Sequence, residues 1–272
     1  MTMINPPFNF TGSKFPLLEQ LLPLFDYSKK TFVDLFVGGG SVYVNVLDKY
    51  DEVVINDVID DLVGIHRELM LRPNGVIEDV KTLAICKNDQ GMYNKLRDHY
   101  NEIGGSDVLW ALMLSCTNNM MRFNKKGGFN QTWGKRGWND NTQKKVFEFV
   151  NHIQKYMKKV DYRSGNFYDV KLYEPSMIYA DPPYTNTEAG YNAFWSVELE
   201  KKLYEYLVNS GKNGNSFALS GVLGEHKNGK RSEIIDKLIS DGYKYTILEG
   251  DYEKVARNKN TKNSQEVLIY NY

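Results

Sequence analysis

The chain has 272 residues, in which 34 lysines and arginines balance 34 aspartates and glutamates, and its composition is that of a soluble globular protein. This length suits one α/β domain with an insertion, or two small domains. No apolar run is long enough to span a bilayer, and the N-terminus lacks the charged and apolar regions of a secretory signal, so we expect a cytoplasmic protein. Cys86 and Cys116 lack metal-site spacing and are expected to be reduced core thiols.

The N-terminal region combines a polar turn with a helix. The turn covers residues 8–14 and the helix is predicted over 16–25, where Leu17, Leu18, Leu21 and Leu22 share one face. Lys14, close to Gly12 at the helix entrance, could meet a carboxylate. On this stretch alone, a solvated surface lysine is the favoured interpretation.

A strand, a glycine turn and a helical pattern follow one another after residue 30. The strand is predicted over 31–36, the turn is Gly38-Gly39-Gly40-Ser41, and a helical pattern starts at Val42. This arrangement is typical of nucleotide binding, because glycines allow the backbone to approach a ligand. No Gly-Lys-Ser/Thr closes the turn and the Gly-x-Gly-x-x-Gly spacing is absent, which disfavours a phosphate loop and a dinucleotide oxidoreductase.

A second strand is predicted over 53–57 and ends at Asp57. An acid at about this distance from a glycine turn grips ribose hydroxyls in such folds, although it could instead cap the next helix. Given the upstream turn, we favour ribose.

The alternation of strands and helices then stops. Helices are predicted over 66–71, 92–100, 107–121 and 143–157, so residues 62–159 are interpreted as an inserted helical subdomain, with 1–61 and 160–272 as the catalytic domain. Between Met120 and Lys145 the chain has seven basic residues and one acid. Since the net charge is zero, nucleic-acid binding needs such a local patch. Three rings expected to be exposed (Phe129, Trp133 and Trp138) favour nucleic acid over a solvated loop.

The remaining chain returns to strands and helices. Strands are predicted within 160–170 and over 176–180, 216–222, 243–248 and 266–270, with helices over 196–209 and 232–240. Ser196 is the expected cap of the first helix, and Phe194 and Trp195 are interpreted as core anchors.

The strand over 176–180 ends in Asp181-Pro182-Pro183-Tyr184. The two prolines fix a rigid turn that places a carboxylate, a free carbonyl and an aromatic ring where open α/β sheets bind ligands. Asp181 and the Pro182 carbonyl could accept the two hydrogens of an exocyclic amino group on a base, and Tyr184 could stack on that base. The alternative is that the motif is only a tight turn.

Together these motifs resemble Dam-type DNA adenine N6-methyltransferases of bacteria and phages, over nearly the whole chain. The matching segments are Thr11-Gly12-Ser13-Lys14, the stretch from Val33 to Val42, Asn56-Asp57, Asp181-Pro182-Pro183-Tyr184, and the hairpin pieces Asn119-Met120-Met121-Arg122-Phe123-Asn124 and Gly134-Lys135-Arg136. Their order resembles the alpha arrangement of amino-methyltransferases. One segment departs, because Thr132-Trp133-Gly134 stands where many members have Pro-Phe-Gly, so the site read, GATC or a related sequence, stays open.

The resemblance implies a Rossmann-like S-adenosylmethionine-dependent methyltransferase sheet with an inserted helical DNA-recognition subdomain, acting on duplex DNA by base flipping without a metal. It implies that the cofactor is bordered by Phe10, Thr11, Gly12, Lys14, Asp34, Phe36, Gly38, Gly39, Ser41, Asp57, Phe167 and Asp181. It implies that DNA is contacted by Asn119, Met120, Arg122, Asn124, Lys125, Lys126, Thr132, Trp133, Lys135 and Arg136.

Three alternatives remain: the same chemistry on RNA or on a protein amide, a catalytically silent DNA-binding module, and the disfavoured oxidoreductase. The RNA major groove is too narrow for side chains, which favours DNA. An intact Asp181-to-Tyr184 motif argues against a silent module. Whether a restriction endonuclease partners the protein stays open.

Overall fold

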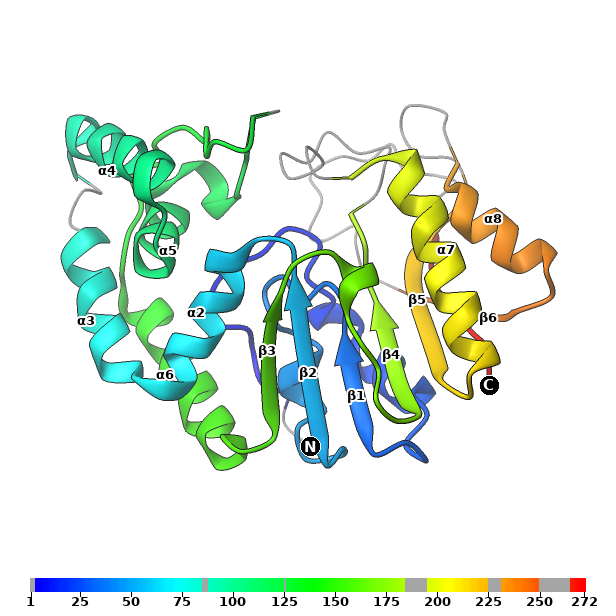
Figure 1. Ribbon diagram of the computed structural model, residues 1–272. Helices are drawn as coiled ribbons and strands as arrows, with labels where there is room; N and C mark the ends of the chain where they lie inside the picture. The colour runs from blue at the N-terminus through cyan, green and yellow to red at the C-terminus, as the bar shows by residue number, and fades with distance from the viewer. Residues whose placement is uncertain (1–2, 85–87, 125, 184–194, 225–230, 250–264) are drawn as a thin grey trace.

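The computed structural model describes residues 3–84, 88–124, 126–183, 195–224, 231–249 and 265–272. Its centre is a seven-stranded sheet in the order β3-β2-β1-β4-β5-β7-β6 (Figure 1). The strands are β1 (Thr31–Asp34), β2 (Glu52–Asp57), β3 (Val160–Ser164), β4 (Ser176–Ala180), β5 (Ser216–Leu223), β6 (Lys244–Leu248) and β7 (Gln265–Tyr270). β7 runs antiparallel to both its neighbours, and the other pairs are parallel. The predicted Rossmann-like α/β sheet is confirmed.

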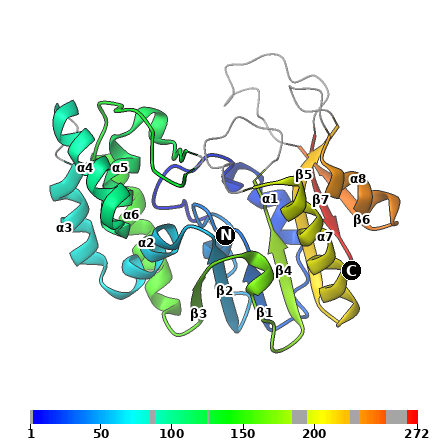
Figure 2. The ribbon, with the colours of Figure 1, turned by 45° about the horizontal axis from the view of Figure 1, so that its top comes forward.

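Alternate residues of the central strands enter two different cores. Phe32 and Tyr179 belong to one buried cluster, whereas Val33 and Ile178 belong to the other. This alternation follows from the strand period of two and explains why these strands are apolar throughout. The N-terminal segment, with η1 (Phe15–Leu17), α1 (Leu18–Leu21) and η2 (Leu22–Leu24), packs on the first face. The helices α7 (Val197–Lys212) and α8 (Glu233–Ser240) pack on the second (Figure 2). Ser196 caps α7 as expected, accepting from the Leu199 N–H at 3.2 Å.

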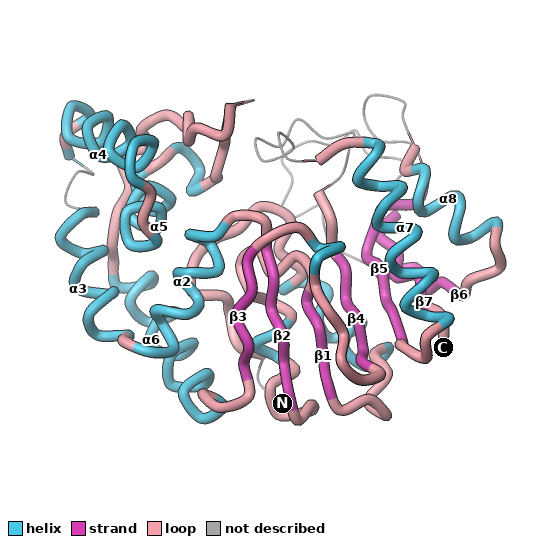
Figure 3. Tube along the Cα trace, in the orientation of Figure 1, coloured by secondary structure: helices cyan, strands magenta, loops and turns pink. Residues whose placement is uncertain are grey.

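The segment between β2 and β3 folds into helices that lie beside the sheet (Figure 3). They are α2 (Asp60–Leu71), α3 (Pro73–Leu83), α4 (Gln90–Ile103), α5 (Ser106–Ser115), α6 (Asp140–Ile153) and the short η6 (Gln154–Tyr156). Their buried side chains join the same cluster as Phe32 and Tyr179, so this insertion is packed continuously onto the first core. None of the helices in the described ranges is long and apolar enough to cross a membrane.

Three details of the sequence-based helices were wrong or missed. α3 was not predicted, although Pro73 starts it and Val76, Ile77 and Val80 bury one face. The helix predicted over 107–121 ends at Ser115, after which Cys116 is extended and η5 (Thr117–Asn119) contains left-handed Asn118. The helical pattern after the glycine turn forms only η3 (Tyr43–Asn45), because the Asn45 side chain bonds the backbone of Ile4 and Ser41 instead.

The basic segment between Met120 and Lys145 includes most of an antiparallel hairpin, whose aromatic rings face inward. Bridges join Cys116 to Trp133 and Phe123 to Phe129. Phe129 is buried and meets Phe123 edge-to-face, which corrects the prediction of an exposed ring. Trp133 is half-buried, and so is Trp138, which packs on Trp110. The aromatic residues therefore pack the hairpin onto the helical insertion, and their rings are not fully exposed to solvent.

Gly134 fixes how closely the hairpin lies on the end of α5. Its N–H donates to the Ser115 carbonyl at 2.8 Å, and an added Cβ would overlap the Cys116 carbonyl group. We expect Gly134→Ala to lower the free energy of unfolding by about 1–3 kcal/mol, because this clash is with backbone. The matched control is Gly128→Ala in the same hairpin, where the nearest atoms are the ends of Asn side chains. Chemical denaturation of both variants tests this, and equal stabilities would contradict it.

Candidate active site

One pocket lies where β1, β2 and β4 end, and every residue predicted to border the cofactor lines it. These strands are hydrogen-bonded neighbours, in the order β2-β1-β4, and they run parallel. Their carboxyl ends therefore deliver Asp57, Asp34 and Asp181 to the same edge of the sheet. Pro182 and Pro183 also line the pocket, whereas Tyr184 lies outside the described residues.

The glycine turn forms one wall. Gly38 and Gly40 adopt positive φ angles of 48° and 82°, which glycine tolerates without strain. A Cβ added to Gly38 would lie 2.8 Å from the Phe10 ring, and one on Gly39 would lie 2.7 Å from Phe10 Cβ. The turn therefore has to be glycine because Phe10, from the N-terminal segment, packs directly against it.

Asp57 supports this turn from the end of β2. Its Oδ2 accepts from the Gly38 N–H and its Oδ1 from the Ile59 N–H, both at 3.1 Å. The N-cap position of α2 is occupied by Ile59, which makes no side-chain hydrogen bond to the helix. Asp57 lies two residues earlier and accepts from the N–H of Ile59 itself, so it does not act as the helix cap. Burial raises the pKa of Asp57 to about 6, and backbone hydrogen bonds from Ile59, Gly38 and Val58 oppose this rise.

Lys14 and Asp181 form a buried ion pair. Lys14 Nζ lies 2.8 Å from Asp181 Oδ1, and the lysine side chain is only 3% exposed against 19% for the aspartate. The interpretation of Lys14 as a solvated surface lysine is therefore wrong. Burial raises the pKa of Asp181, and the lysine opposes that rise by stabilising the charged form.

Asp34 is the third carboxylate and the most buried, at 1% exposure. Its Oδ1 has no hydrogen-bond partner among the described residues. Burial, with Asp181 and Asp57 nearby, holds the pKa of Asp34 well above its usual range. An unpaired buried acceptor is costly, so this oxygen calls for a donor from a ligand.

Part of the pocket lining is aromatic. Trp195 packs on Phe36 and Phe167, with ring centroids 5.5 and 5.8 Å apart. Phe36 and Phe167 were predicted at the site, whereas Trp195 was interpreted as a core anchor and in fact also lines the pocket. Its position just before the cap of α7, beyond the end of β4, was the available signal.

Comparison with known proteins decides the family. The model of the D12 class N6 adenine-specific DNA methyltransferases matches residues 10–254. The chain belongs to this family. The predicted resemblance to DNA adenine methyltransferases is thus confirmed.

Several curated methyltransferases are similar to this member of the D12 class. Modification methylase StsI from Streptococcus sanguinis is 31% identical over 284 residues, covering 99% of this chain and 43% of its own. The type II methyltransferase M.FokI from Planomicrobium okeanokoites is 29% identical, with the same coverage of 99% and 43%. The chain thus spans less than half the length of these two relatives. A DNA adenine methylase from Serratia marcescens is 25% identical, covering 67% of this chain and 68% of its own.

Among solved structures, precorrin 8W decarboxylase from Methanobacterium thermoautotrophicum aligns over 100% of both chains with a TM-score of 0.43 and 11% identity.

The hairpin of this D12-class chain has polar side chains on its surface, several of which are hydrogen-bonded to the hairpin backbone. Arg122, Asn124, Lys126, Thr132, Lys135 and Arg136 are exposed, while Asn119, Met120 and Trp133 are half-buried. Lys125 lies outside the described residues. Their contacts to DNA stay predictions.

Several hairpin residues predicted to contact DNA also have internal hydrogen-bond partners. Arg122 donates from Nε to Asn130 Oδ1 at 3.0 Å and from Nη2 to the Asn130 carbonyl at 2.7 Å. The Asn119 amide donates to the carbonyls of Met113 and Leu114, and its oxygen accepts from Arg136. Asn119 and Lys135 both have positive φ angles, so the base of the hairpin holds strained, oriented residues.

No group of three or more His, Cys, Asp or Glu side chains in the described ranges is arranged to hold a metal ion. Cys116 is a buried free thiol, as expected, and Cys86 lies outside the described residues.

We expect Lys14→Met to raise the pKa of Asp181 further, because the substitution removes the cation that stabilises its ionised form. The measurement is the pH titration of the Asp181 carboxyl carbon by NMR in the ligand-free protein. Lys145→Met is the control, since Lys145 contacts Asn9 of the same N-terminal segment. An unchanged titration midpoint in Lys14→Met would show that the ion pair does not govern Asp181.

Proposed function

We propose that this chain transfers a methyl group from S-adenosylmethionine to the exocyclic amino group of adenine in duplex DNA, at a short site that is GATC or a related sequence. The target base would be flipped out of the duplex. The observation that carries the proposal is the acidic lining of the pocket, whose described residues include three aspartates and one cation, Lys14. Phosphates would be repelled there, whereas a sulfonium cofactor that also carries an ammonium group would be attracted.

The residues of the pocket fit such a cofactor. The unpaired Oδ1 of Asp34 suits a buried ammonium donor, and Asp57 at the end of β2 suits ribose hydroxyls. The rings of Phe36, Phe167 and Trp195 suit the adenine. The bound cofactor would supply an activated methyl group and leave a neutral thioether behind, while the acceptor nitrogen loses one of its two hydrogens as a proton.

Asp181 is the group best placed to activate the acceptor nitrogen. Lys14 engages Oδ1, so Oδ2 remains to accept a hydrogen from the amino group, and the Pro182 carbonyl can accept the other. These contacts would draw the nitrogen lone pair out of the ring. The two prolines fix both acceptors, so catalysis would rest on positioning and polarisation. Tyr184 keeps its predicted role as the stacking ring.

The hairpin is proposed as the reader of duplex DNA. Asn130 occupies one edge of the Arg122 guanidinium, and among the described residues Nη1 has no partner that would prevent it from reaching a guanine. Bracing of this kind fixes the direction of the side chain before DNA arrives. The buried Lys14–Asp181 pair argues against a silent DNA-binding module, because it charges and orients the acceptor that chemistry needs. Competition between duplex DNA and RNA tests the RNA alternative.

The names of the relatives, modification methylase and type II methyltransferase, support a role in restriction-modification. We place that role in the cytoplasm of a bacterial or phage-infected cell, where duplex DNA is the partner. The proposal leaves the identity of any restriction endonuclease open.

Asp181→Ala is expected to abolish methyl transfer while DNA binding stays close to that of the wild type, because Asp181 directly follows β4 and is not on the hairpin. Transfer of labelled methyl groups and DNA binding by the purified variant test this. Asp161→Ala, which removes an exposed aspartate of β3, is the control. Substantial turnover by Asp181→Ala would remove Asp181 from the reaction.

Cofactor affinity is expected to fall as the pH is lowered from 7 to 5. The pKa of Asp57 is about 6, and ribose hydroxyls would donate to its ionised form, so protonation on the acid side weakens the contact. Asp57→Asn should bind about tenfold more weakly at pH 7 and lose much of this pH dependence. Calorimetric titrations across this range are the measurement. An identical pH dependence in Asp57→Asn would exclude Asp57 as its source.

Arg122→Ala is expected to cost about 1–3 kcal/mol at one base position and to relax specificity there. Lys126→Ala, its control near the hairpin tip, should weaken binding to all sequences alike and reduce the salt slope by about one. Binding to single-base variants of the site at several salt concentrations distinguishes the two. If Arg122→Ala lowers affinity uniformly, this hairpin does not read the base through Arg122.

A further inference from the structure

Two side chains hydrogen-bond to the backbone of Gly38 in the glycine turn, and only one of them, Asp57, belongs to the motifs found in the sequence. The Gly38 N–H donates to Asp57, whereas the Gly38 carbonyl lies 2.9 Å from Nε2 of His66. His66 is on α2 and is fully buried. It does not line the pocket, so its action on a ligand would pass through the turn.

The contacts of His66 define its tautomer. A carbonyl oxygen can only accept, so Nε2 must carry the proton that it donates to Gly38. Nδ1 lies 3.2 Å from the Tyr43 hydroxyl and is then the acceptor of that hydroxyl proton. Burial lowers the pKa of His66 to about 4, which keeps the ring neutral and able to play both parts.

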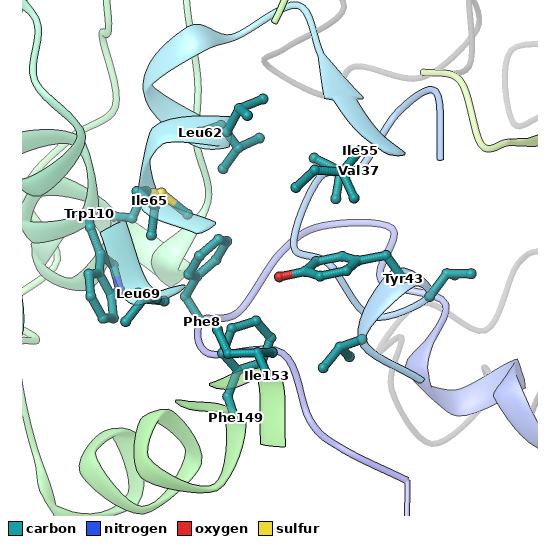
Figure 4. Close-up of a cluster of buried hydrophobic side chains, with 14 of the residues drawn as sticks. Phe8, Val37, Tyr43, Ile55, Leu62, Ile65, Leu69, Trp110, Phe149 and Ile153 are labelled. Carbon is teal, nitrogen blue, oxygen red and sulfur yellow. The ribbon is translucent and has the colours of Figure 1, made fainter. Parts of the chain in front are cut away.

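The surroundings of the ring leave it little freedom. Phe8, Tyr43 and Phe149 pack around it, with ring centroids 5.6, 5.3 and 6.2 Å away. In Figure 4 the Tyr43 hydroxyl points towards Phe8 and the side chains of α2. A Cβ on Gly40 would lie 2.6 Å from the Tyr43 ring and 2.7 Å from His66 Cε1. Tyr43 and His66 thus contact the turn at Gly40, and Phe10 contacts it at Gly38 and Gly39.

We propose that His66 is a positioning residue for cofactor binding, which holds the Gly38 carbonyl and thereby sets the path of the glycine turn along the pocket. The inference rests on the proposed function, since the ligand is taken to be S-adenosylmethionine. α2 is also bonded to the recognition side of the molecule, because Asp61 Oδ1 accepts from the Gly105 N–H at the start of α5. The cofactor turn and the helical insertion therefore share one rigid element.

Two substitutions replace the two ring nitrogens of His66 one at a time. They distinguish a positioning role from a merely structural one. In His66→Gln the side-chain amide can reach the place of Nε2 and donate to Gly38. In His66→Asn the shorter amide matches Nδ1 and can meet only Tyr43. His152 offers a matched control, because its Nε2 contacts the Val44 carbonyl at 3.0 Å, outside the pocket lining.

The experiment measures S-adenosylmethionine binding by calorimetry without DNA, together with thermal unfolding and the Gly38 amide resonance. We expect His66→Asn to bind about tenfold more weakly than the wild type, and His66→Gln to restore most of the affinity, at similar unfolding midpoints. The Gly38 resonance should shift in His66→Asn and return towards its wild-type position in His66→Gln. His152→Asn should bind as the wild type does.

The inference is overturned if His66→Asn keeps wild-type affinity, or if affinity in both His66 variants follows stability alone. An unmoved Gly38 resonance in His66→Asn also overturns it, and this readout needs no ligand. Failure of the wild type to bind S-adenosylmethionine would instead contradict the proposed function. The two ideas are therefore separable in one set of samples.

Discussion

The crowding of three carboxylates at one edge of the sheet, two of them buried and the third 19% exposed, is the constraint on which the site depends. Asp34 is paired in register with Tyr179 of β4 and Ile55 of β2, so the chain places Asp181 and Asp57 just beyond those partners. Loss of solvation raises the pKa of all three, and at Asp34 the neighbouring carboxylates of Asp181 and Asp57 add to that rise. The fold tolerates this arrangement through Lys14 and the N–H groups around Asp57. The remaining imbalance is what a positively charged ligand would relieve.

The N-terminal segment is part of the site and not an appendage to the sheet. It delivers Lys14 to Asp181 and the Phe10 ring to the glycine turn, while Phe8 packs against His66. Because Phe10 packs against Gly38 and Gly39 and His66 packs against Gly40, the shape of the turn depends on segments that are far apart in the chain. Part of the pocket lining and part of the packing would therefore be lost together if this segment moved away.

Features that depend on a few neighbouring residues could be predicted from the sequence, whereas features that depend on tertiary contacts could not. The apolar runs of β1, β2 and β4, the glycine turn and the prolines after Asp181 carry their structure within a few residues, so the sheet and the pocket lining followed from them. Lys14 and His66 gave no local sign of burial, because their partners lie on other elements. Phe129 was expected to be exposed from its polar neighbours, yet it packs on Phe123 and Tyr100. α5 ends next to left-handed Asn118 and Asn119, and Asn119 accepts a hydrogen bond from Arg136 across the hairpin.

The most direct test of the account is the modification left on DNA. The protein would be expressed in cells that lack adenine methylation, and plasmid DNA from those cells would be sequenced by a method that detects N6-methyladenine. The account predicts N6-methyladenine at one short, fixed sequence in duplex DNA, and none in cells that express Asp181→Ala. Plasmid without the mark despite abundant folded protein, or a methyl group found only on cytosine or on RNA, would contradict it.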